Sequence, residues 1–321
     1  MASKLLRRVL IVSDRSPRPS SRSLPGFTSS RLFSSSNSQP LPATASSPPP
    51  PPTTVDPPSS SSASKFGSKI RNDSVRSSIK DPELAKFSAI ADTWWDSEGP
   101  FKPLHLMNPT RLAFIRSTLC RHFRKDTNSA RPLEGLKIID VGCGGGILSE
   151  PLARMGAVVT GIDAVDKNIK IARVHADLDP GTSNIEYSCT TAEKLVEEQR
   201  KFDAVIALEV IEHVANPAEF CKSLSALTTP GGATVISTIN RSMRAYATAI
   251  VAAEYILHWL PKGTHQWSSF LTPEELALIL KRASVSVKEM AGFVYNPLTG
   301  RWSLSDDISV NFIAFGTKDG Q

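Results

Sequence analysis

Cysteines, acidic residues near the N-terminus and long apolar runs are all scarce in this chain of 321 residues. The four cysteines include no CxxC pair, which excludes a zinc ribbon and a CxxC redox motif and favours a reducing compartment. The most extended apolar run lies within residues 241–262 and is interrupted by Glu254 and His258. It covers about 16 residues, whereas a membrane-spanning helix needs about 20 with few charges. We therefore predict that this run does not cross a bilayer.

The basic excess of the chain belongs to residues 1–70. They contain nine of the 37 Lys and Arg residues, two of the 31 acids and half of the 24 prolines, so the rest of the chain is nearly neutral. The pI of about 9.2 therefore reflects this leader, and we expect no nucleic-acid partner. So polar a segment has too little apolar surface to offset the entropy of ordering it, which predicts disorder.

The first 36 residues are rich in Arg and Ser and poor in acids, which is typical of an organelle transit peptide. Residues 5–8 (Leu-Leu-Arg-Arg) can begin a basic amphipathic helix, which favours a mitochondrial address over a chloroplast one. A solvated tail without an address is the alternative. We divide the chain into a transit peptide with a Ser/Pro-rich linker, residues 1–70, and a catalytic domain, residues 71–321.

Strands and helices alternate in the second part of the chain. Helices are expected over residues 82–95 and 109–123, as an N-terminal helical extension. Strands are expected at 136–141, 157–162, 185–190, 203–208, 234–238, 284–290 and 310–315. This alternation predicts an α/β fold with a doubly wound, mostly parallel, seven-stranded sheet. The short link before the last strand favours an antiparallel hairpin at one edge.

A glycine-rich turn follows the first expected strand and includes Gly142 and Gly144. The dinucleotide fingerprint would need glycine where Ile147 stands, which disfavours a nicotinamide dehydrogenase. Asp140 precedes the turn; a carboxylate there repels a pyrophosphate but accepts a hydrogen bond from an ammonium group. Asp163 ends the second strand, a position suited to ribose hydroxyls. A nucleoside joined to an amino acid without phosphate describes S-adenosylmethionine; a turn without a ligand is the alternative.

Glu209, Glu212 and His213 follow the fourth expected strand, which ends at Leu208. If this segment is helical, the three side chains share one face at the carboxyl edge of the sheet. In one interpretation they bind Mg²⁺, which would lower the pKa of a phenol. In another, His213 is a general base that Glu212 orients. A third interpretation is a helix start whose acids lie near the positive end of the dipole.

Several separate stretches, in this order, resemble the ubiquinone-biosynthesis O-methyltransferases, a family of class I methyltransferases with a Rossmann-like fold. They are residues 93–96, 101–105, 108–111, 140–146, 209–213, 253–257, 261–265 and 295–297. The resemblance spans roughly residues 82–317. It implies methyl transfer from S-adenosylmethionine to ring hydroxyls of a polyprenyl-dihydroxybenzoate and of a demethylubiquinol.

The resemblance also assigns roles by position. The residues that it places at the cofactor are Arg111, Gly142, Asp163 and Leu208, to which the motif adds Asp140 and Gly144. Those that it places at the metal are Glu209, Glu212 and His213, with Glu212 and His213 also the catalytic candidates. It further implies a peripheral protein on the matrix face of the mitochondrial inner membrane, in a complex with other ubiquinone-biosynthesis proteins.

Residues 240–270 are the predicted insert that faces a membrane or forms a lid. Basic residues flank its apolar run, and such a helix is expected to lie on a lipid surface. A helix that covers the substrate pocket is the alternative, and both can hold. Trp94 and Trp95 are further candidates for a lid, with ordinary packing as the alternative.

Two other functions are compatible with the fold. One is a methyltransferase that acts on another phenol or on a ring carbon, which the cofactor motif alone does not exclude. The other is a non-catalytic, lipid-binding scaffold subunit. The presence of the acidic residues and glycines at the expected site argues against the scaffold.

Overall fold

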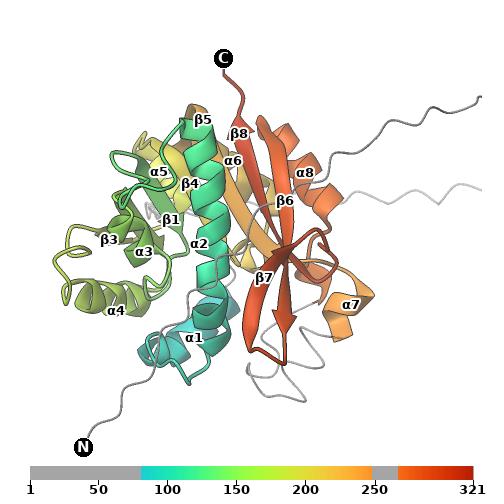
Figure 1. Cartoon of the computed structure of the whole chain (residues 1–321), viewed down its shortest axis with the longest axis horizontal. Coiled ribbons are helices and arrows are strands. Elements are labelled where there is room, and N and C mark those ends of the chain that lie inside the picture. Colours follow the sequence, from blue (N-terminus) through green and yellow to red (C-terminus); the bar gives the residue numbers. More distant parts are fainter. Residues whose placement is uncertain (1–80, 248–266, 321) are drawn as a thin grey trace, which may run out of the picture. The chain divides into compact units, whose positions relative to one another are not determined.

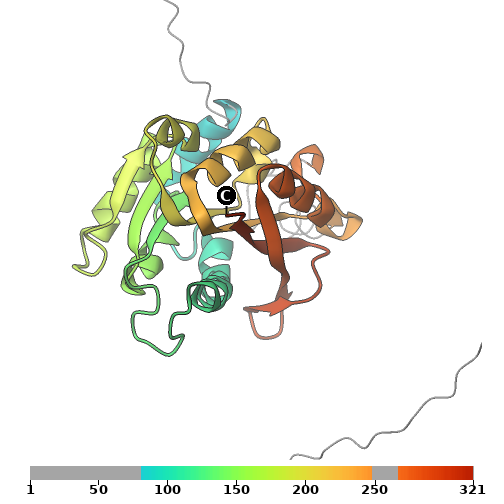
Figure 2. The same ribbon diagram turned by 90° about the horizontal axis from the view of Figure 1, so that it is seen from above.

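The computed structural model describes residues 81–247 and 267–320, all within the unit Lys69–Gln321. The predicted transit peptide and linker, and residues 248–266 of the predicted insert, lie outside the described residues. The described part contains an eight-stranded sheet. Helices cover both of its faces, as Figure 1 and Figure 2 show. The predicted doubly wound α/β class is therefore confirmed.

The strands follow one another across the sheet in the order β3-β2-β1-β4-β5-β8-β6-β7. Their bounds are β1 Lys137–Val141, β2 Val158–Asp163, β3 Glu186–Cys189, β4 Phe202–Leu208, β5 Thr228–Ile239, β6 Val285–Asn296, β7 Arg301–Ser305 and β8 Asn311–Lys318. Strands β1 to β5 pair in parallel, whereas β8 runs antiparallel to both β5 and β6, and β7 to β6. The C-terminal ends of the five parallel strands therefore meet at one edge of the sheet.

The prediction of seven strands was wrong by one, because β7 was missed. The signal was present, since Trp302 and Leu304 alternate with polar residues, but it covers only the five residues Arg301–Ser305 and none of them is buried. The predicted antiparallel pairing of the strands now named β6 and β8 is confirmed, but β8 lies inside the sheet. The edge is formed by β7.

The helices cover the sheet and extend it at the N-terminus. Their bounds are α1 Asp81–Ile90, η1 Ala91–Thr93, α2 Lys102–Phe123, α3 Ser149–Arg154, α4 Asp166–Ala176, α5 Ala192–Glu197, η2 Ile211–His213, α6 Pro217–Leu227, α7 Met243–Ala245, η4 Trp267–Ser269 and α8 Pro273–Arg282. Helix α2 begins at Lys102 and not at Pro109, because Pro103 supplies the proline of the first turn and Pro109 lies within the helix. Within residues 81–247 and 267–320, no helix is long and apolar enough to span a bilayer.

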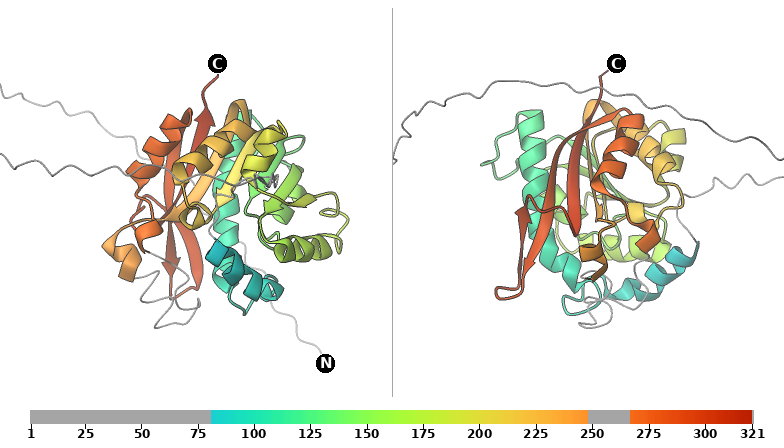
Figure 3. Two further views of the ribbon diagram at one scale, coloured as in Figure 1. Left: turned by 180° about the vertical axis from the view of Figure 1, so that it is seen from behind. Right: turned by 90° about the vertical axis from the view of Figure 1, so that its right-hand side faces the viewer.

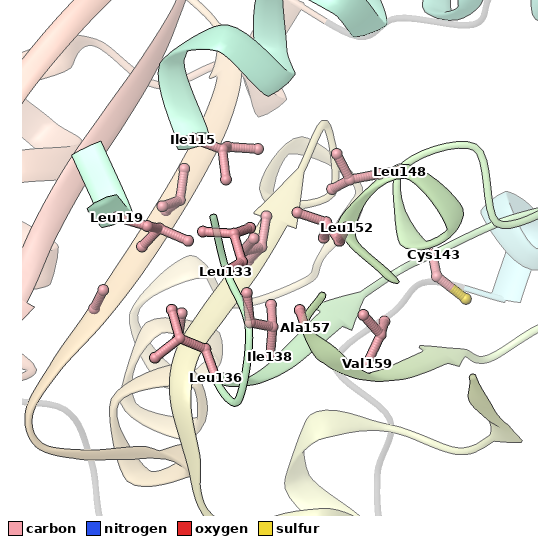
Figure 4. Close-up of a cluster of buried hydrophobic side chains, with 14 of the residues drawn as sticks. Ile115, Leu119, Leu133, Leu136, Ile138, Cys143, Leu148, Leu152, Ala157 and Val159 are labelled. Atoms are coloured by element: carbon pink, nitrogen blue, oxygen red, sulfur yellow. The ribbon is translucent and has the colours of Figure 1, made fainter. Parts of the chain in front are cut away.

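Two apolar clusters fill the space between the sheet and its helices. Ile138 points to the face covered by α2, α3 and α4, where it joins Ile115 and Leu152 (Figure 4). Ile139, the next residue of β1, points to the face covered by α5, α6 and α8. Figure 3 shows α2 and α8 on opposite sides of the strands. This alternation holds β1 rigidly at the centre of the sheet, and β1 leads directly into the glycine-rich turn.

Candidate functional site

The glycine-rich turn follows β1 and packs tightly against two other segments. Gly142 and Gly144 have φ angles of 75° and 53°, in the left-handed region that favours glycine. A Cβ atom on Gly142 would come within 2.5 Å of Val210, and one on Gly144 within 2.3 Å of the Trp94 ring. Both conformation and space therefore require glycine at these two predicted positions.

Asp163, the last residue of β2, is held against this turn. Its Oδ2 atom accepts a hydrogen bond from the Gly144 backbone N–H at 3.0 Å. Its Oδ1 atom accepts from the backbone N–H of Val165 at 2.8 Å and from the Asn168 amide at 3.1 Å. Burial raises the pKa of Asp163, and the hydrogen bonds from Val165 and Gly144 oppose that rise. The carboxylate is thereby oriented at the predicted ribose position.

Asp140 lies buried in β1, beneath the turn, where the Ser149 hydroxyl donates a hydrogen bond to its Oδ2 atom at 2.6 Å. Burial raises the pKa of Asp140 to about 6; the Ser149 hydrogen bond and the positive charge of Arg111 act against this rise. An incoming cation would favour the ionised form. This carboxyl group is therefore suited to an ammonium ligand.

Arg111, on α2, is buried and forms an ion pair with Glu209, the residue after β4. The Glu209 Oε1 atom also accepts a hydrogen bond from the Ser237 hydroxyl of β5 at 2.7 Å. Among the described residues, the buried Nε atom of Arg111 has no hydrogen-bond partner. A buried guanidinium with a free donor, close enough to affect the pKa of Asp140, fits a ligand that carries a carboxylate.

Glu212 is buried beside Glu209 and close to β5. The Thr238 hydroxyl donates a hydrogen bond to its Oε2 atom at 3.0 Å. Burial, together with the negative charge of Glu209, raises the pKa of Glu212 to about 8. Glu212 therefore carries a proton at neutral pH.

His213 ends the short helix η2, and its ring meets the ring of Phe87 of α1 edge-on, with 5.1 Å between centroids. The prediction that the three metal candidates share one helical face is wrong. Glu209 has a φ of 52° and lies outside η2, which begins at Ile211. A residue in the left-handed conformation does not continue a right-handed helix. Its side chain therefore does not share a helical face with the residues that follow it.

The predicted Mg²⁺ ligands are thus not assembled as a set. In the part of the chain that the structure describes, no group of three or more His, Cys, Asp or Glu side chains is arranged to hold a metal ion. To bind one, Glu209 would have to give up Arg111, and Glu212 would have to lose its proton. The residues in this arrangement do not fit the metal.

Leu208, the last residue of β4, pairs in register with Ser237 at the same edge of the sheet. Its side chain packs against the apolar cluster beneath α2. The structure therefore gathers all six predicted cofactor residues at adjacent ends of β1, β2 and β4 and on the facing helix α2.

Four polar residues of the site were missed by the sequence analysis: Asn168, Ser149, Ser237 and Thr238. Asn168 is buried in α4, where it shares a face with Ala172 at helical spacing. A polar residue on an apolar helix face was the available signal. Ser237 and Thr238 are polar residues near the end of the apolar strand β5, at the same edge as the predicted site.

Comparisons with known proteins identify the family of this chain. A family described as a methyltransferase domain matches residues 112–287. The mitochondrial ubiquinone biosynthesis O-methyltransferase of Arabidopsis thaliana is 78% identical over 254 residues, 79% of each chain. The ubiquinone biosynthesis O-methyltransferase of Parvibaculum lavamentivorans is 48% identical over 76% of this chain and 96% of its own.

A solved structure is similar at a lower level. It is the magnesium protoporphyrin IX methyltransferase of Synechocystis with bound S-adenosylmethionine, 18% identical with a TM-score of 0.48 over 74% of this chain and 98% of that one. The identities of the two sequence relatives are decisive. The chain belongs to the ubiquinone biosynthesis O-methyltransferases, a family of S-adenosylmethionine-dependent enzymes.

Proposed function

We propose that this protein transfers methyl groups from S-adenosylmethionine to ring hydroxyls of a polyprenyl-dihydroxybenzoate and of a demethylubiquinol. The names of the two relatives support the substrate class. The observation that carries the proposal is the placement of Asp163, Asp140 and Glu212–His213 at the ends of β2, β1 and β4, which are neighbours in the sheet. A cofactor bound at the first two would present its methyl group beside the third.

Each end of the cofactor has a matching group in the chain. Asp163 would accept hydrogen bonds from the ribose hydroxyls, since its carboxylate is already oriented by the turn. Asp140 would take the ammonium group, and the free Nε donor of Arg111 would take the carboxylate. The cofactor, when bound, supplies an activated methyl group, so the chain has only to position the acceptor, remove its proton and exclude water.

The acceptor's proton goes to His213 in this proposal. The alternative base, Glu212, is protonated at neutral pH and already accepts a hydrogen bond from Thr238. Glu212 would then orient the segment that carries His213. No step is assigned to a metal, because Glu209 is held by Arg111 and Ser237.

The relative from Arabidopsis is named as mitochondrial, which supports a mitochondrial location for this protein. Contact with the matrix face of the inner membrane would use residues 240–270. The described start of this segment supports that contact: Met243 and Tyr246 are exposed apolar side chains. A complex with other ubiquinone-biosynthesis proteins stays a prediction.

The proposal is tested with labelled S-adenosylmethionine and a short-chain prenyl-dihydroxybenzoate, using the full chain. We expect one methyl group to be transferred to a ring oxygen, as mass spectrometry and NMR of the product would show. The matched acceptor, with that hydroxyl already methylated, should take no label. Cofactor binding without transfer, or a product methylated on carbon, would contradict the proposal.

A further inference from the structure

The segment that joins η1 to α2 lies directly on the glycine-rich turn. The ring of Trp94 occupies the space that a side chain on Gly144 would need, and a Cβ atom on Gly145 would come within 2.5 Å of the Trp94 Cβ atom. Trp94 is 8% exposed and stacks on Phe101, with ring centroids 3.7 Å apart and 6° between the planes. The turn and the N-terminal segment are therefore shaped to each other.

A chain of hydrogen bonds runs from Trp94 to the proposed ribose site. The indole N–H of Trp94 donates to Oδ1 of Asn168 at 2.9 Å. The Asn168 amide N–H donates in turn to Oδ1 of Asp163 at 3.1 Å. Asn168 is 2% exposed, so its amide has one orientation that satisfies both partners. The indole thus fixes the rotamer of the residue that orients Asp163.

The same segment is anchored on both sides of Trp94. The indole N–H of Trp95 donates to the Gly145 carbonyl at 2.9 Å, and its ring stacks on His175 of α4 at 3.4 Å. On the other side, His105 lies 2.8 Å from the Trp94 carbonyl through its Nε2 atom. Trp95 therefore binds both the glycine-rich turn and helix α4, which follows Asp163.

Further toward the N-terminus, Phe87 of α1 contacts His213. The segment from Phe87 to His105 thus touches both the cofactor turn and the proposed base. A buried indole N–H needs an acceptor in any case, but here the acceptor is the side chain that also donates to Asp163. The direction of the Trp94–Asn168–Asp163 chain points to a role in binding.

We propose that Trp94 and Asn168 are positioning residues for the cofactor. Trp94 closes the N-terminal segment over the glycine-rich turn, and through Asn168 it holds Asp163 in the orientation that binds the ribose. Closure of the segment and binding of the ribose are then coupled. Weakening the contact of either Trp94 or Asn168 is therefore expected to weaken the binding of both the cofactor and its product. This inference rests on the proposed role of Asp163.

The test compares Trp94→Phe with Trp302→Phe. Phenylalanine keeps the apolar ring on Phe101 but removes the indole N–H, whereas Trp302 lies on β7, away from the turn. We expect Trp94→Phe to raise the Kd for S-adenosylhomocysteine and the KM for S-adenosylmethionine about five- to tenfold, the size expected of one buried hydrogen bond. The kcat should stay close to that of Trp302→Phe.

A second variant tests Asn168, the middle residue of the Trp94–Asn168–Asp163 hydrogen-bond chain. Asn168→Asp replaces the amide donor by a carboxylate that faces Asp163, so we expect a larger loss of affinity than in Trp94→Phe. The double variant should lose less than the sum of the two losses, because both act through Asp163.

Equal cofactor affinity in Trp94→Phe and Trp302→Phe would overturn the inference, and so would additive losses in the double variant. Asp163→Ala separates this failure from that of the proposed function. If Asp163→Ala weakens cofactor binding and Trp94→Phe does not, only the positioning role of Trp94 is disproved. If neither does, the ribose site itself is wrong.

Discussion

The buried Arg111 of α2 forms an ion pair with the partly buried Glu209, the residue after β4, and so links the helix to the end of the sheet. The sequence analysis assigned the first residue to the cofactor and the second to a metal. Because they are paired, each side chain fixes the position of the other and neutralises its charge. Changes at either residue are therefore expected to affect the whole edge of the sheet.

Glu209→Gln should lower the free energy of unfolding by about 3 kcal/mol, because the buried Arg111 guanidinium would lose its counter-ion. The matched control is Glu289→Gln, which breaks an exposed pair with Arg121 and should cost no more than about 1 kcal/mol. Urea unfolding followed by circular dichroism measures both. Equal losses in the two variants would show that the buried pair is not a stabilising contact.

Glu212 should make the protein less stable as the pH rises. Its pKa of about 8 in the folded protein exceeds the ordinary value of 4.5, so the native state binds the proton more tightly than the unfolded state. The stabilising contribution is complete below pH 4.5 and is lost as the pH rises to 8 and above, by up to roughly 5 kcal/mol. Glu212→Gln mimics the protonated form and should flatten this dependence. Urea unfolding at pH 5, 7 and 9 measures the free energy of unfolding of both proteins. The same dependence on pH in both would contradict the role of Glu212.

Any Mg²⁺ bound through Glu212 should bind more tightly at pH 9 than at pH 6, because the ion has to displace the carboxyl proton. Between pH 6 and the pKa, each unit is expected to raise the affinity by up to about tenfold. Calorimetric titration of the protein with Mg²⁺ measures the effect, with Glu212→Gln as the control. An affinity that is independent of pH, or unchanged in the variant, would place the ion elsewhere.

Met243→Ser combined with Tyr246→Ser should reduce binding to vesicles that contain anionic lipid, if the start of the 240–270 segment contacts a bilayer. Both side chains are exposed, and the apolar area that they would bury on lipid is worth about 1–3 kcal/mol together. Leu278→Ser changes an exposed apolar residue on α8 and should leave binding unchanged. Vesicle flotation compares the three proteins. Equal loss in the control would indicate a non-specific surface effect.

The parts of the site that depend on local sequence could be predicted. The sequence placed Asp163 correctly at the end of a buried strand, and it placed the turn correctly because a run of glycines follows such a strand. Strand β7 was missed because its alternation of Trp302 and Leu304 with polar residues extends over only five residues.

Contacts between distant segments could not be predicted either. Trp94 and Asn168 are 74 residues apart, and no local pattern shows that an indole and an amide will meet. The metal interpretation failed for a related reason. It assumed helical geometry from Glu209 onwards, but that residue has a left-handed backbone and lies outside η2, and its side chain is bonded to Arg111 and Ser237.

The place of β8 has a consequence for the order in which the domain is built. This strand lies between β5 and β6, yet it follows both in the chain. Apart from each other, the strands of the β6–β7 hairpin therefore have no strand to pair with until Asn311–Lys318 has been synthesised. Until then, two sheet edges that are inner ones in the finished fold stay open to pairing with other chains. A chain that stops before Asn311 is thus expected to aggregate, even though every residue of the cofactor site is present.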